Sequence, residues 1–423
     1  MKKIGIGLLG FGTVGTGVAR IIEKNSALIE QRTGLRIQVQ KVLVKDLDRE
    51  RDLLSKEFFT TRIEDVVKDP KVDIVVELMG GVSPAKDYIL RAFSEGKHVV
   101  SANKELIASD FEELMTTAGR YRRAFLFEAA VGGAVPVLRT IRDSMSSDKI
   151  EEIRGIVNGT TNYILSKMTE EGADFGEVLE EARCSGYLEA DPRADIDGHD
   201  AARKIAILAT VAFGSLVGSH QVYTEGIADI TQRDIEIAEK LGKKIKLIAC
   251  ARDREGIRVS VYPCMVDKGS FFAKTEGSFN AISLFSDTFG ETILYGKGAG
   301  KLPTASAVMA DIIEIGGLKG RPDFLQNRYE ELSEREVLCF DKIGTRALVY
   351  WERSDEKADI CVIKEVLREE GTQLLADIED DRRRILLVEA CEGDRKKAVA
   401  RLQKEGLVKE VLKTIRMEEE RGS

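Results

Sequence analysis

Histidine and cysteine are scarce in this sequence of 423 residues. It has three histidines and six cysteines, and the cysteines, at positions 184, 250, 264, 339, 361 and 391, form no C-x-x-C pair. Such scattered residues fit neither a zinc site nor a disulfide framework, and they leave little room for a histidine-based metal centre. Reduced thiols are typical of a cytoplasmic protein, and we expect that location.

Long apolar runs and an excess of positive charge are also missing. No stretch reaches the roughly 18 consecutive apolar residues that a membrane-spanning helix needs. The N-terminus is apolar, but it carries glycines and lacks an A-x-A-like cleavage site, which argues against a signal peptide. A net charge of −8 disfavours non-specific nucleic-acid binding. The sequence therefore predicts neither a membrane nor a nucleic-acid partner.

The composition is otherwise that of a globular protein, and a glycine motif stands near its start. Hydrophobic residues make up 43% of the chain, and its length predicts two or three domains.

The glycine motif near the start is G-x-G-x-x-G, formed by Gly10, Phe11, Gly12, Thr13, Val14 and Gly15. It lies between a predicted strand and a predicted helix, where glycines allow a tight turn and a close approach to a pyrophosphate. Unpaired N–H groups at a helix N-terminus attract such an anion, so the motif predicts a bound dinucleotide.

Strands and helices alternate through residues 1–135. This order is typical of an α/β fold with a doubly wound parallel sheet of the Rossmann type, which binds ligands beyond the carboxyl ends of its strands. Gly80, Gly81 and Lys104 occupy such ends. We therefore expect Gly80 and Lys104 to contact the cofactor.

The second predicted strand, residues 39–44, bears on the choice of cofactor. A basic residue after this strand accommodates the NADP phosphate, whereas an acidic one binds the NAD ribose. Here Lys45 comes first and Asp46 follows. The order favours NADP and leaves NAD open.

The run LEADPRADIDGHDAARK, residues 188–204, concentrates carboxylates before a predicted helix. Pro192 and Gly198 predict that its first part is irregular. Asp200 and Lys204 stand four apart and share one face of the helix. Such a pair is usually a solvated surface ion pair. A carboxylate-rich loop leading to a lysine can also hold an amine and donate a proton, so both interpretations stay open.

Two other turns carry polar groups. A strand is predicted over 125–128 and a helix over 137–145. The glycine-rich stretch 129–136 between them follows Glu128, and its carbonyls with that carboxylate could hold a hard cation, although a tight turn before a helix is commoner. Asn158, Gly159 and Thr160 join a predicted strand to a helix. They suit a substrate contact, and they suit helix capping equally well.

Residues 136–302 lack the regular alternation of the N-terminal region, and two consecutive strands are predicted there over 244–252 and 257–264. We expect an α+β catalytic and dimerisation domain there, with an open mixed sheet that packs in the interface of a homodimer or homotetramer. A second glycine-rich turn contains Gly300 and precedes a helix predicted over 303–318. We expect this turn to close over the cofactor and the helix to return to the first domain.

Seven motifs, taken in order, resemble those of homoserine dehydrogenases. They are GFGTVGTGV, ELMGG, SANKELIA, EAAVGGAVPV, NGTTNYIL, LEADPRADIDGHDAARK and YGKGAGKLPTASAV. The resemblance implies reversible reduction of L-aspartate 4-semialdehyde to L-homoserine with NAD(P)H, a step of threonine and methionine biosynthesis.

The resemblance also implies roles for single residues. Lys204 corresponds to the family's proton donor and Lys104 to a second lysine near nicotinamide and substrate, while Glu189 and Asp200 resemble substrate contacts. Hydride transfer to an aldehyde leaves negative charge on oxygen, which an ammonium group can stabilise and protonate. A monovalent-cation site, usually for sodium, is implied by Glu128 and the carbonyls of Val131, Gly133 and Val135.

The C-terminal region, residues 337–423, follows a charged linker predicted at 319–336. Its predicted order, βαββαβ, is the ferredoxin-like plan. Behind this enzyme it resembles an ACT regulatory domain, which implies an amino-acid effector such as L-threonine. Residues 354–358, SDEKA, replace the Pro-Gly turn where effectors usually dock. A purely structural or dimerising role is therefore an equal alternative.

Two other functions stay open. One is a different NAD(P)-dependent dehydrogenase of an amino-acid-like substrate, and the other is a nucleotide-sensing regulator without turnover. Fold alone does not separate these possibilities. The joint presence of Lys104, Glu189, Asp200 and Lys204 favours the active enzyme.

Overall fold

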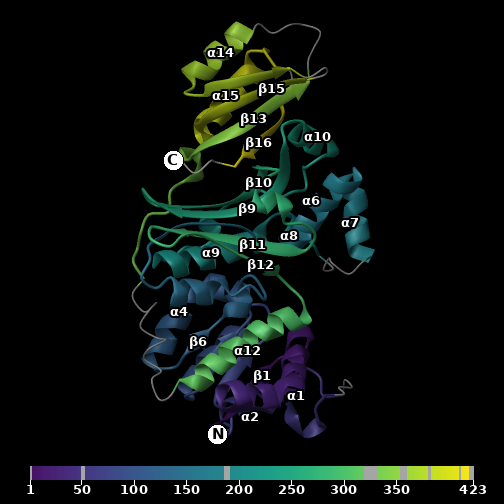
Figure 1. Cartoon of the computed structure of the whole chain (residues 1–423). Coiled ribbons are helices and arrows are strands. Elements are labelled where there is room, and N and C mark those ends of the chain that lie inside the picture. The colour runs from purple at the N-terminus through teal and green to yellow at the C-terminus, as the bar shows by residue number, and fades with distance from the viewer. Residues whose placement is uncertain are drawn as a thin grey trace. The chain divides into compact units, whose positions relative to one another are not determined.

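The computed structural model describes residues 2–48, 53–184, 191–318, 332–352, 360–379, 383–408 and 411–418 (Figure 1). The chain forms two compact units. Unit 1 comprises residues 1–153, 200–221 and 278–335, and unit 2 comprises residues 154–199, 222–277 and 336–423. Within the described ranges, no helix combines the length and the apolar character that crossing a membrane requires.

Unit 1 is built on a parallel sheet with the strand order β3-β2-β1-β4-β5-β6. The strands are β1 (Lys2–Leu9), β2 (Leu35–Leu43), β3 (Phe59–Thr60), β4 (Ile74–Glu77), β5 (His98–Ser101) and β6 (Phe125–Leu126). The order reverses between β1 and β4, and sheets of this kind bind ligands at that switch point. The predicted doubly wound α/β fold is confirmed.

Helices complete the core of unit 1. They are α1 (Thr13–Thr33), α2 (Glu64–Val67), α3 (Ala85–Ser94), α4 (Lys104–Arg120), α9 (His199–Phe213, in this unit from residue 200) and α12 (Lys301–Gly317). One apolar cluster joins the first strand to helices from both ends of the unit, through Ile6, Val18, Val308 and Ile312. Strands covered by helices on both faces bury almost every side chain, as β1 does from Ile4 to Leu9.

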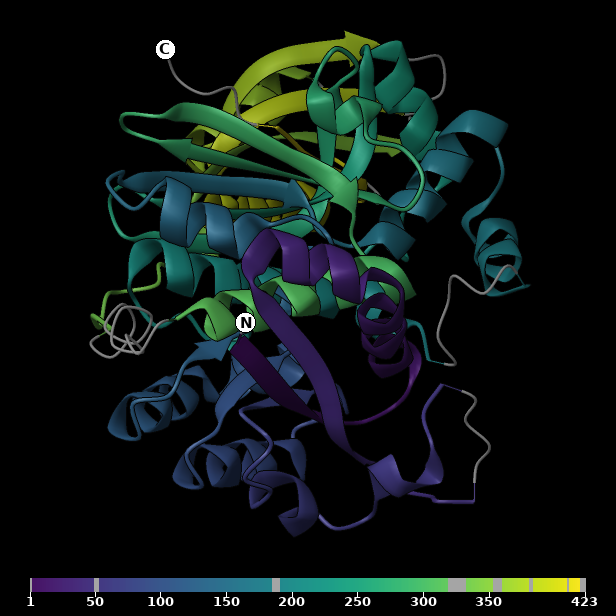
Figure 2. The ribbon, with the colours of Figure 1, turned by 60° about the horizontal axis from the view of Figure 1, so that its bottom comes forward.

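Helix α12 lies along α1 in both ribbon views (Figures 1 and 2). The crossing is close because of Gly17, where an added Cβ would lie 2.8 Å from the Lys301 carbonyl oxygen and 2.9 Å from the Ala305 Cβ. This is the helix predicted over 303–318, and it begins two residues earlier, at Lys301.

The segment after β6 differs from its prediction. The strand predicted over 125–128 ends at Leu126, and Glu128 begins the 3-10 turn η2 (Glu128–Ala130). The helix predicted over 137–145 divides into α5 (Val137–Arg139) and a π-helical turn, η3 (Thr140–Ser144). The remaining strands of unit 1 form the antiparallel hairpin β11 (Phe279–Ser286) and β12 (Gly290–Lys297).

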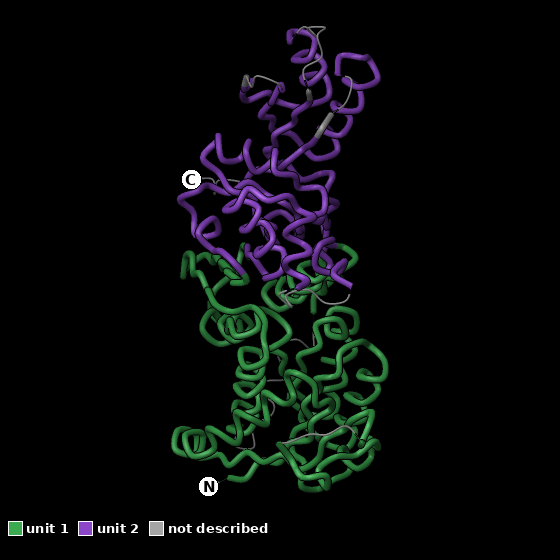
Figure 3. Tube along the Cα trace, turned by 90° about the vertical axis from the view of Figure 1, so that its right-hand side faces the viewer, with its two compact units in different colours: residues 1–153, 200–221, 278–335 green, residues 154–199, 222–277, 336–423 purple. Residues whose placement is uncertain are grey.

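Unit 2, drawn in purple in Figure 3, contains a mixed sheet, as predicted. Strand β7 (Ile150–Ile156) leads the chain into this unit. β9 (Lys243–Asp253) pairs antiparallel with β10 (Ile257–Asp267), and β10 also pairs with β8 (Tyr223–Thr224) and β16 (Val411–Met417) in parallel. The helices of the middle region are α6 (Gly159–Glu171), α7 (Phe175–Cys184), α8 (Arg193–Ile196), α10 (Gln232–Lys240) and α11 (Phe271–Lys274).

The C-terminal part of unit 2 has the predicted sequence of elements. They are β13 (Gly344–Glu352), α14 (Ile360–Glu369), β14 (Gln373–Glu379), β15 (Arg383–Cys391), α15 (Glu392–Lys404) and β16. Its strand order, β16-β13-β15-β14, is that of the ferredoxin-like plan. Residues 354–358 and most of the linker predicted at 319–336 lie outside the described residues.

Candidate active site

The glycine motif forms the turn between β1 and α1. Gly10 has a φ of 103°, and a Cβ at Gly15 would lie 2.5 Å from the Gly10 carbonyl oxygen. Gly12 is the N-cap of α1 without a side-chain cap bond, and a Cβ built there meets nothing within 4 Å. Phe11 packs edge-on against Phe59, with ring centroids 5.3 Å apart. Open space at an uncapped helix N-terminus fits the pyrophosphate of a dinucleotide.

The other predicted cofactor residues also lie at strand ends or helix starts of unit 1. Gly80 follows β4 with a φ of 75°, Lys104 begins α4 after β5, and Gly300 is the N-cap of α12. Lys45 is exposed two positions beyond β2. Since β1 and β4 are neighbours at the switch point, the motif and Gly80 belong to the same edge of the sheet, and these residues fit a nicotinamide dinucleotide.

Glu77, at the end of β4, is a site residue that the sequence analysis missed. Its buried carboxylate accepts hydrogen bonds from the Met79 N–H at 2.7 Å and the Ser101 hydroxyl at 2.7 Å. Ser101 Oγ accepts from the Asn103 N–H, and Asn103 Nδ2 donates to the Gly81 carbonyl. Burial raises the pKa of Glu77, while these donors oppose the rise. The network ties the loop after β4 to the residue before Lys104.

Two lysines meet at one carboxylate in unit 1. Asp200 lies in the first turn of α9 and is 3% exposed. Lys104 Nζ lies 2.7 Å from Asp200 Oδ1, and Lys204 Nζ lies 2.7 Å from Asp200 Oδ2. The Lys104 side chain is 41% exposed, whereas that of Lys204 is 10% exposed. The surface-pair interpretation of Asp200 and Lys204 is therefore wrong, because the carboxylate is buried between two ammonium groups.

The electrostatics of this cluster favour the charged form of Asp200. Burial by itself would raise the pKa of the carboxyl. The charges of Lys204 and Lys104 outweigh burial and hold the pKa of Asp200 well below its ordinary value. Asp200 therefore stays ionised and fixes two ammonium groups, the arrangement expected of a site that stabilises a developing oxyanion.

The predicted substrate residues of unit 2 lie at the start of α6. Asn158 is the N-cap: its Oδ1 accepts the Thr161 N–H at 2.8 Å, and its Nδ2 donates to Asp195 at 2.7 Å. Gly159 and Thr160 form the first turn of the helix. Asp195 is a partner that no sequence spacing indicated. Glu189 lies outside the described residues.

Glu128 is buried in unit 1 among backbone donors. Its two carboxylate oxygens accept the N–H groups of Leu138 at 3.0 Å and Arg139 at 2.7 Å. Burial raises the pKa of Glu128 to about 7. Beside it Asp311, 1% exposed, accepts the Glu128 N–H, and burial followed by the charge of Glu128 raises the pKa of Asp311. Two buried carboxylates next to a carbonyl-rich turn are a donor set that suits a hard cation.

Comparison with known proteins agrees with this arrangement. Residues 10–128 match the family model described as "Homoserine dehydrogenase, NAD binding domain", and residues 136–313 match the one described as "Homoserine dehydrogenase". The homoserine dehydrogenase of Corynebacterium glutamicum is 37% identical over 99% of this chain and 96% of its own length. The chain belongs to the homoserine dehydrogenase family. It is accordingly placed among NAD(P)-dependent oxidoreductases.

Solved homoserine dehydrogenases share the fold. The enzyme from Thiobacillus denitrificans superposes with a TM-score of 0.94 and 36% identity over 99% of both chains. A hyperthermophilic archaeal homoserine dehydrogenase in complex with NADPH superposes with a TM-score of 0.63 and 29% identity, covering 74% of this chain and 97% of that one. Lys104 falls in the first matched stretch, and Asp200 and Lys204 fall in the second, so the ionic cluster joins both.

Proposed function

We propose that this chain catalyses, in the cytoplasm, the reversible NAD(P)H-dependent reduction of L-aspartate 4-semialdehyde to L-homoserine, with Lys204 as proton donor and acceptor. The observation that carries the proposal is the buried Asp200 carboxylate between Lys104 and Lys204 in a member of the homoserine dehydrogenase family. Another amino-acid-like substrate stays the alternative, and a regulator without turnover would have little use for such a cluster.

The chemistry follows from the charges. The nicotinamide, when bound, supplies the hydride for reduction and takes it up in oxidation. Negative charge then develops on the aldehyde oxygen, which the Lys204 ammonium stabilises and protonates. Asp200 holds Nζ of Lys204 at 2.7 Å and so fixes the direction of the proton. Lys104 shares the same carboxylate and adds a second positive charge near the oxygen. The family resemblance assigns Glu189 and Asp200 to the substrate.

Cofactor preference and the cation belong to the same proposal. Lys45 favours NADP, and one solved relative was described in complex with NADPH.

We place a monovalent cation, sodium by resemblance, at Glu128 and the carbonyls of Val131, Gly133 and Val135. Replacing sodium chloride by choline chloride then lowers the melting temperature of the wild type but not of Glu128→Gln. Equal shifts in both proteins would remove the cation from this site.

Assembly and regulation complete the proposal. We propose a homodimer or homotetramer that packs through the mixed sheet, and residues 337–423 as an ACT-like domain with an amino-acid effector. A purely structural role of this domain remains the competing interpretation, because residues 354–358 lack the usual Pro-Gly turn.

One assay tests the function directly. Homoserine-dependent reduction of NADP and of NAD is followed by the absorbance of the reduced nicotinamide, with and without millimolar threonine. We expect turnover with homoserine, higher kcat/KM with NADP than with NAD, and a change of rate with the effector. Turnover absent with homoserine but present with another hydroxy amino acid would transfer the proposal to that substrate, and an unchanged rate in threonine would favour the structural role.

A further inference from the structure

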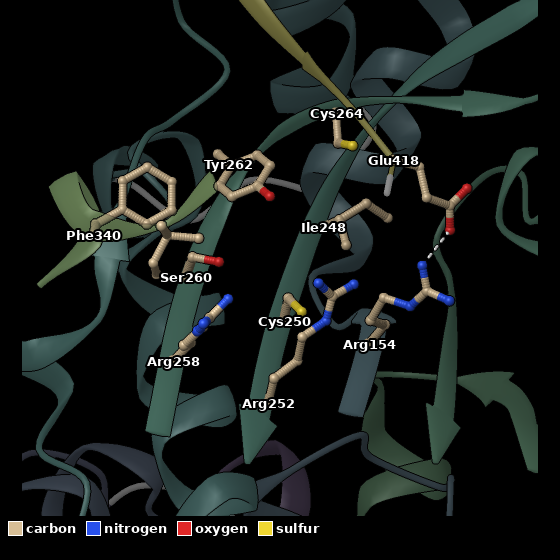
Figure 4. Close-up of a pocket in the computed structure, with 11 residues that line it drawn as sticks. Arg154, Ile248, Cys250, Arg252, Arg258, Ser260, Tyr262, Cys264, Phe340 and Glu418 are labelled. Atoms are coloured by element: carbon tan, nitrogen blue, oxygen red, sulfur yellow. Dashed lines mark hydrogen bonds and ion pairs between the residues drawn. The ribbon is translucent and has the colours of Figure 1, made fainter. Parts of the chain in front are cut away.

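A polar hollow in unit 2 lies on the face of β9 and β10, but it has no room for a metabolite. Cys250 and Arg252 stand on one strand and Arg258 on its neighbour (Figure 4). Arg154 at the edge of the hollow is paired with Glu418 at 2.9 Å. The volume is about 40 Å³, enough for a water molecule or two. A more informative polar group lies in unit 1.

That group is the side chain of Asn280, the second residue of β11, which the proposed reaction does not use. Asn280 is fully buried, and within the described ranges neither its Oδ1 nor its Nδ2 has a hydrogen-bond partner. Burying an amide without hydrogen bonds is costly, and most buried polar groups in folded proteins are paired. An amide that is unpaired on both sides therefore needs an explanation.

The amide of Asn280 lies against the glycine-rich turn that follows β12. A Cβ built at Gly298 would stand 2.1 Å from Nδ2 and 2.3 Å from Oδ1 of Asn280, so any side chain at position 298 would displace the amide. Among the described residues, the N–H groups of Gly298 and Ala299 donate no hydrogen bond. Unpaired backbone donors and an unpaired amide thus lie next to each other without being aligned.

The turn is held at both ends but not between them. The Lys297 carbonyl accepts the Ala134 N–H at 3.1 Å, and Gly300 is the N-cap of α12. Gly300 has a φ of 119°, which only glycine adopts without strain. Rotation of the peptide between Gly298 and Ala299 leaves these ends in place and turns a backbone N–H toward the neighbouring amide.

The same turn lies next to the proposed dinucleotide site. It leads from β12 into α12 (Figure 1). The first residue of α12 is Lys301, whose carbonyl oxygen would lie 2.8 Å from a Cβ on Gly17. Gly17 belongs to the second turn of α1, and that helix begins directly after Gly12 of the glycine motif. A change in the turn is therefore made beside the cofactor.

We propose that Asn280 is a positioning residue for the cofactor: its side-chain amide pairs with the backbone of residues 298–299 when the turn closes over the dinucleotide. The inference rests on the proposed function, because it needs a cofactor that closes the turn. The open turn leaves these groups unpaired, so the hydrogen bonds gained on closure add to the affinity for the cofactor. Asn280 takes no part in hydride or proton transfer.

Hydrogen exchange measured by mass spectrometry tests the turn itself. The full chain is compared with and without a saturating reduced cofactor, NADPH or NADH, whichever the wild type binds more tightly. We expect the cofactor to slow exchange in wild-type peptides that contain residues 298–299. In cofactor-saturated Asn280→Ala the same peptides should exchange severalfold faster than in the cofactor-saturated wild type. Equal exchange in the two saturated proteins would overturn the proposal.

Affinity is a second readout that does not depend on turnover. Titration followed by the fluorescence of the reduced nicotinamide should give a Kd about threefold to tenfold higher in Asn280→Ala, the usual effect of one lost hydrogen bond. Asn280→Asp keeps an oxygen at the same place and should recover part of this loss. An unchanged Kd in Asn280→Ala would contradict the positioning role.

Asn162 on α6 is the matched control, because it is a buried asparagine with partners. Its Nδ2 donates to the Thr275 carbonyl at 3.1 Å, and its Oδ1 accepts from Lys246 Nζ at 2.9 Å. Asn162→Ala should lower the melting temperature and leave the Kd for the cofactor unchanged. Asn280→Ala without cofactor should melt close to the wild-type temperature, since no hydrogen bond is lost. An equal drop in both variants, or an Asn280→Ala protein that does not fold, would make Asn280 structural and overturn the proposal.

Failure of this inference is distinguishable from failure of the proposed function. A wild type that binds neither NADPH nor NADH would overturn both. A wild type that binds the cofactor and oxidises homoserine, with an Asn280→Ala protein that matches it in exchange and in Kd, would remove the role of Asn280 alone.

Discussion

Two buried lysines, one in each unit, show how differently a protein can hold the same charge. Lys204 in unit 1 lies 2.7 Å from the ionised Asp200. Lys246 on β9 in unit 2 is 2% exposed and has neutral acceptors. These are Asn162 Oδ1 at 2.9 Å, the Thr275 carbonyl at 2.7 Å and Ser166 Oγ at 3.2 Å. Burial lowers the pKa of Lys246 to about 8. The comparison teaches that two buried lysines can differ mainly in their partners: an ionised carboxylate fixes Lys204, whereas neutral oxygens anchor Lys246 between α6 and β9.

The largest expected effect comes from removing the first of these lysines. Lys204→Ala should lower kcat by about 10²–10⁴-fold, the usual contribution of a general acid. The fold should remain, because Lys104 still pairs with Asp200. Steady-state kinetics and circular dichroism measure the two effects. Wild-type turnover in a folded Lys204→Ala protein would contradict the assignment of the proton donor.

Lys246→Met tests how the buried lysine of unit 2 affects the pH dependence of stability. The pKa of Lys246 is about 8 in the folded chain and ordinarily 10.5, so the unfolded chain binds more protons between these values. Wild-type stability should therefore rise with pH across that window, relative to Lys246→Met, by about 3 kcal/mol at most. Urea unfolding at a series of pH values measures the difference. Parallel pH profiles would show that Lys246 titrates normally.

Glu77 extends the comparison to a buried acid with neutral donors. In Glu77→Gln an amide group must face the Met79 N–H or the Ser101 hydroxyl, so one buried bond is lost. We expect the free energy of unfolding to fall by about 1–3 kcal/mol. The KM for the cofactor should rise more than kcat falls, because the loop after β4 loosens.

Glu64→Gln is the matched control, since the Glu64 side chain is 37% exposed and pairs with Arg91 near the surface. It should change neither stability nor KM measurably. If both glutamate variants behave alike, the network around Glu77 does not hold the loop.

The smallest effect is expected at Lys167, which repeats the four-residue spacing of Asp200 and Lys204 on α6. Its Nζ lies 2.6 Å from Glu171, but the Glu171 side chain is 48% exposed. Lys167→Ala should cost about 0.5 kcal/mol or less and leave turnover unchanged. Denaturant titration and the homoserine assay measure these quantities. A loss of turnover comparable to that of Lys204→Ala would mean that burial does not separate the two pairs.

The regular elements were predictable because their side chains repeat with a fixed period. The strands predicted at 244–252 and 257–264 correspond to β9 and β10, which extend only a few residues further. The helix predicted over 137–145 is present over 137–144, but its change to a π-helical turn at Thr140 has a cause outside the local pattern. Arg139 and Arg142 both reach Glu314 of α12, and the N–H groups of Leu138 and Arg139 bind Glu128. Contacts of this range leave no trace in local spacing.

The candidate site was predictable only in part. Spacing along a helix brought Asp200 and Lys204 together, but nothing local indicates that Lys104 shares the same carboxylate. In the sequence, Glu77 stands at the end of an apolar strand, where a glutamate side chain is expected to point into solvent. Its partner Ser101 ends the next parallel strand, and the register of β4 and β5 places the two residues opposite each other. Register is a property of the folded sheet, and a single sequence does not contain it.

The late position of α12 in the chain has a consequence for biosynthesis. Val308 and Ile312 of this helix complete a core that starts with Ile6 and Val18. Ribosomes add about 5–20 residues per second, so Val18 waits roughly 15 to 60 seconds before Ile312 is synthesised. During that interval the nascent protein exposes the apolar side of α1, which is where chaperones would bind and where a translational pause would promote aggregation.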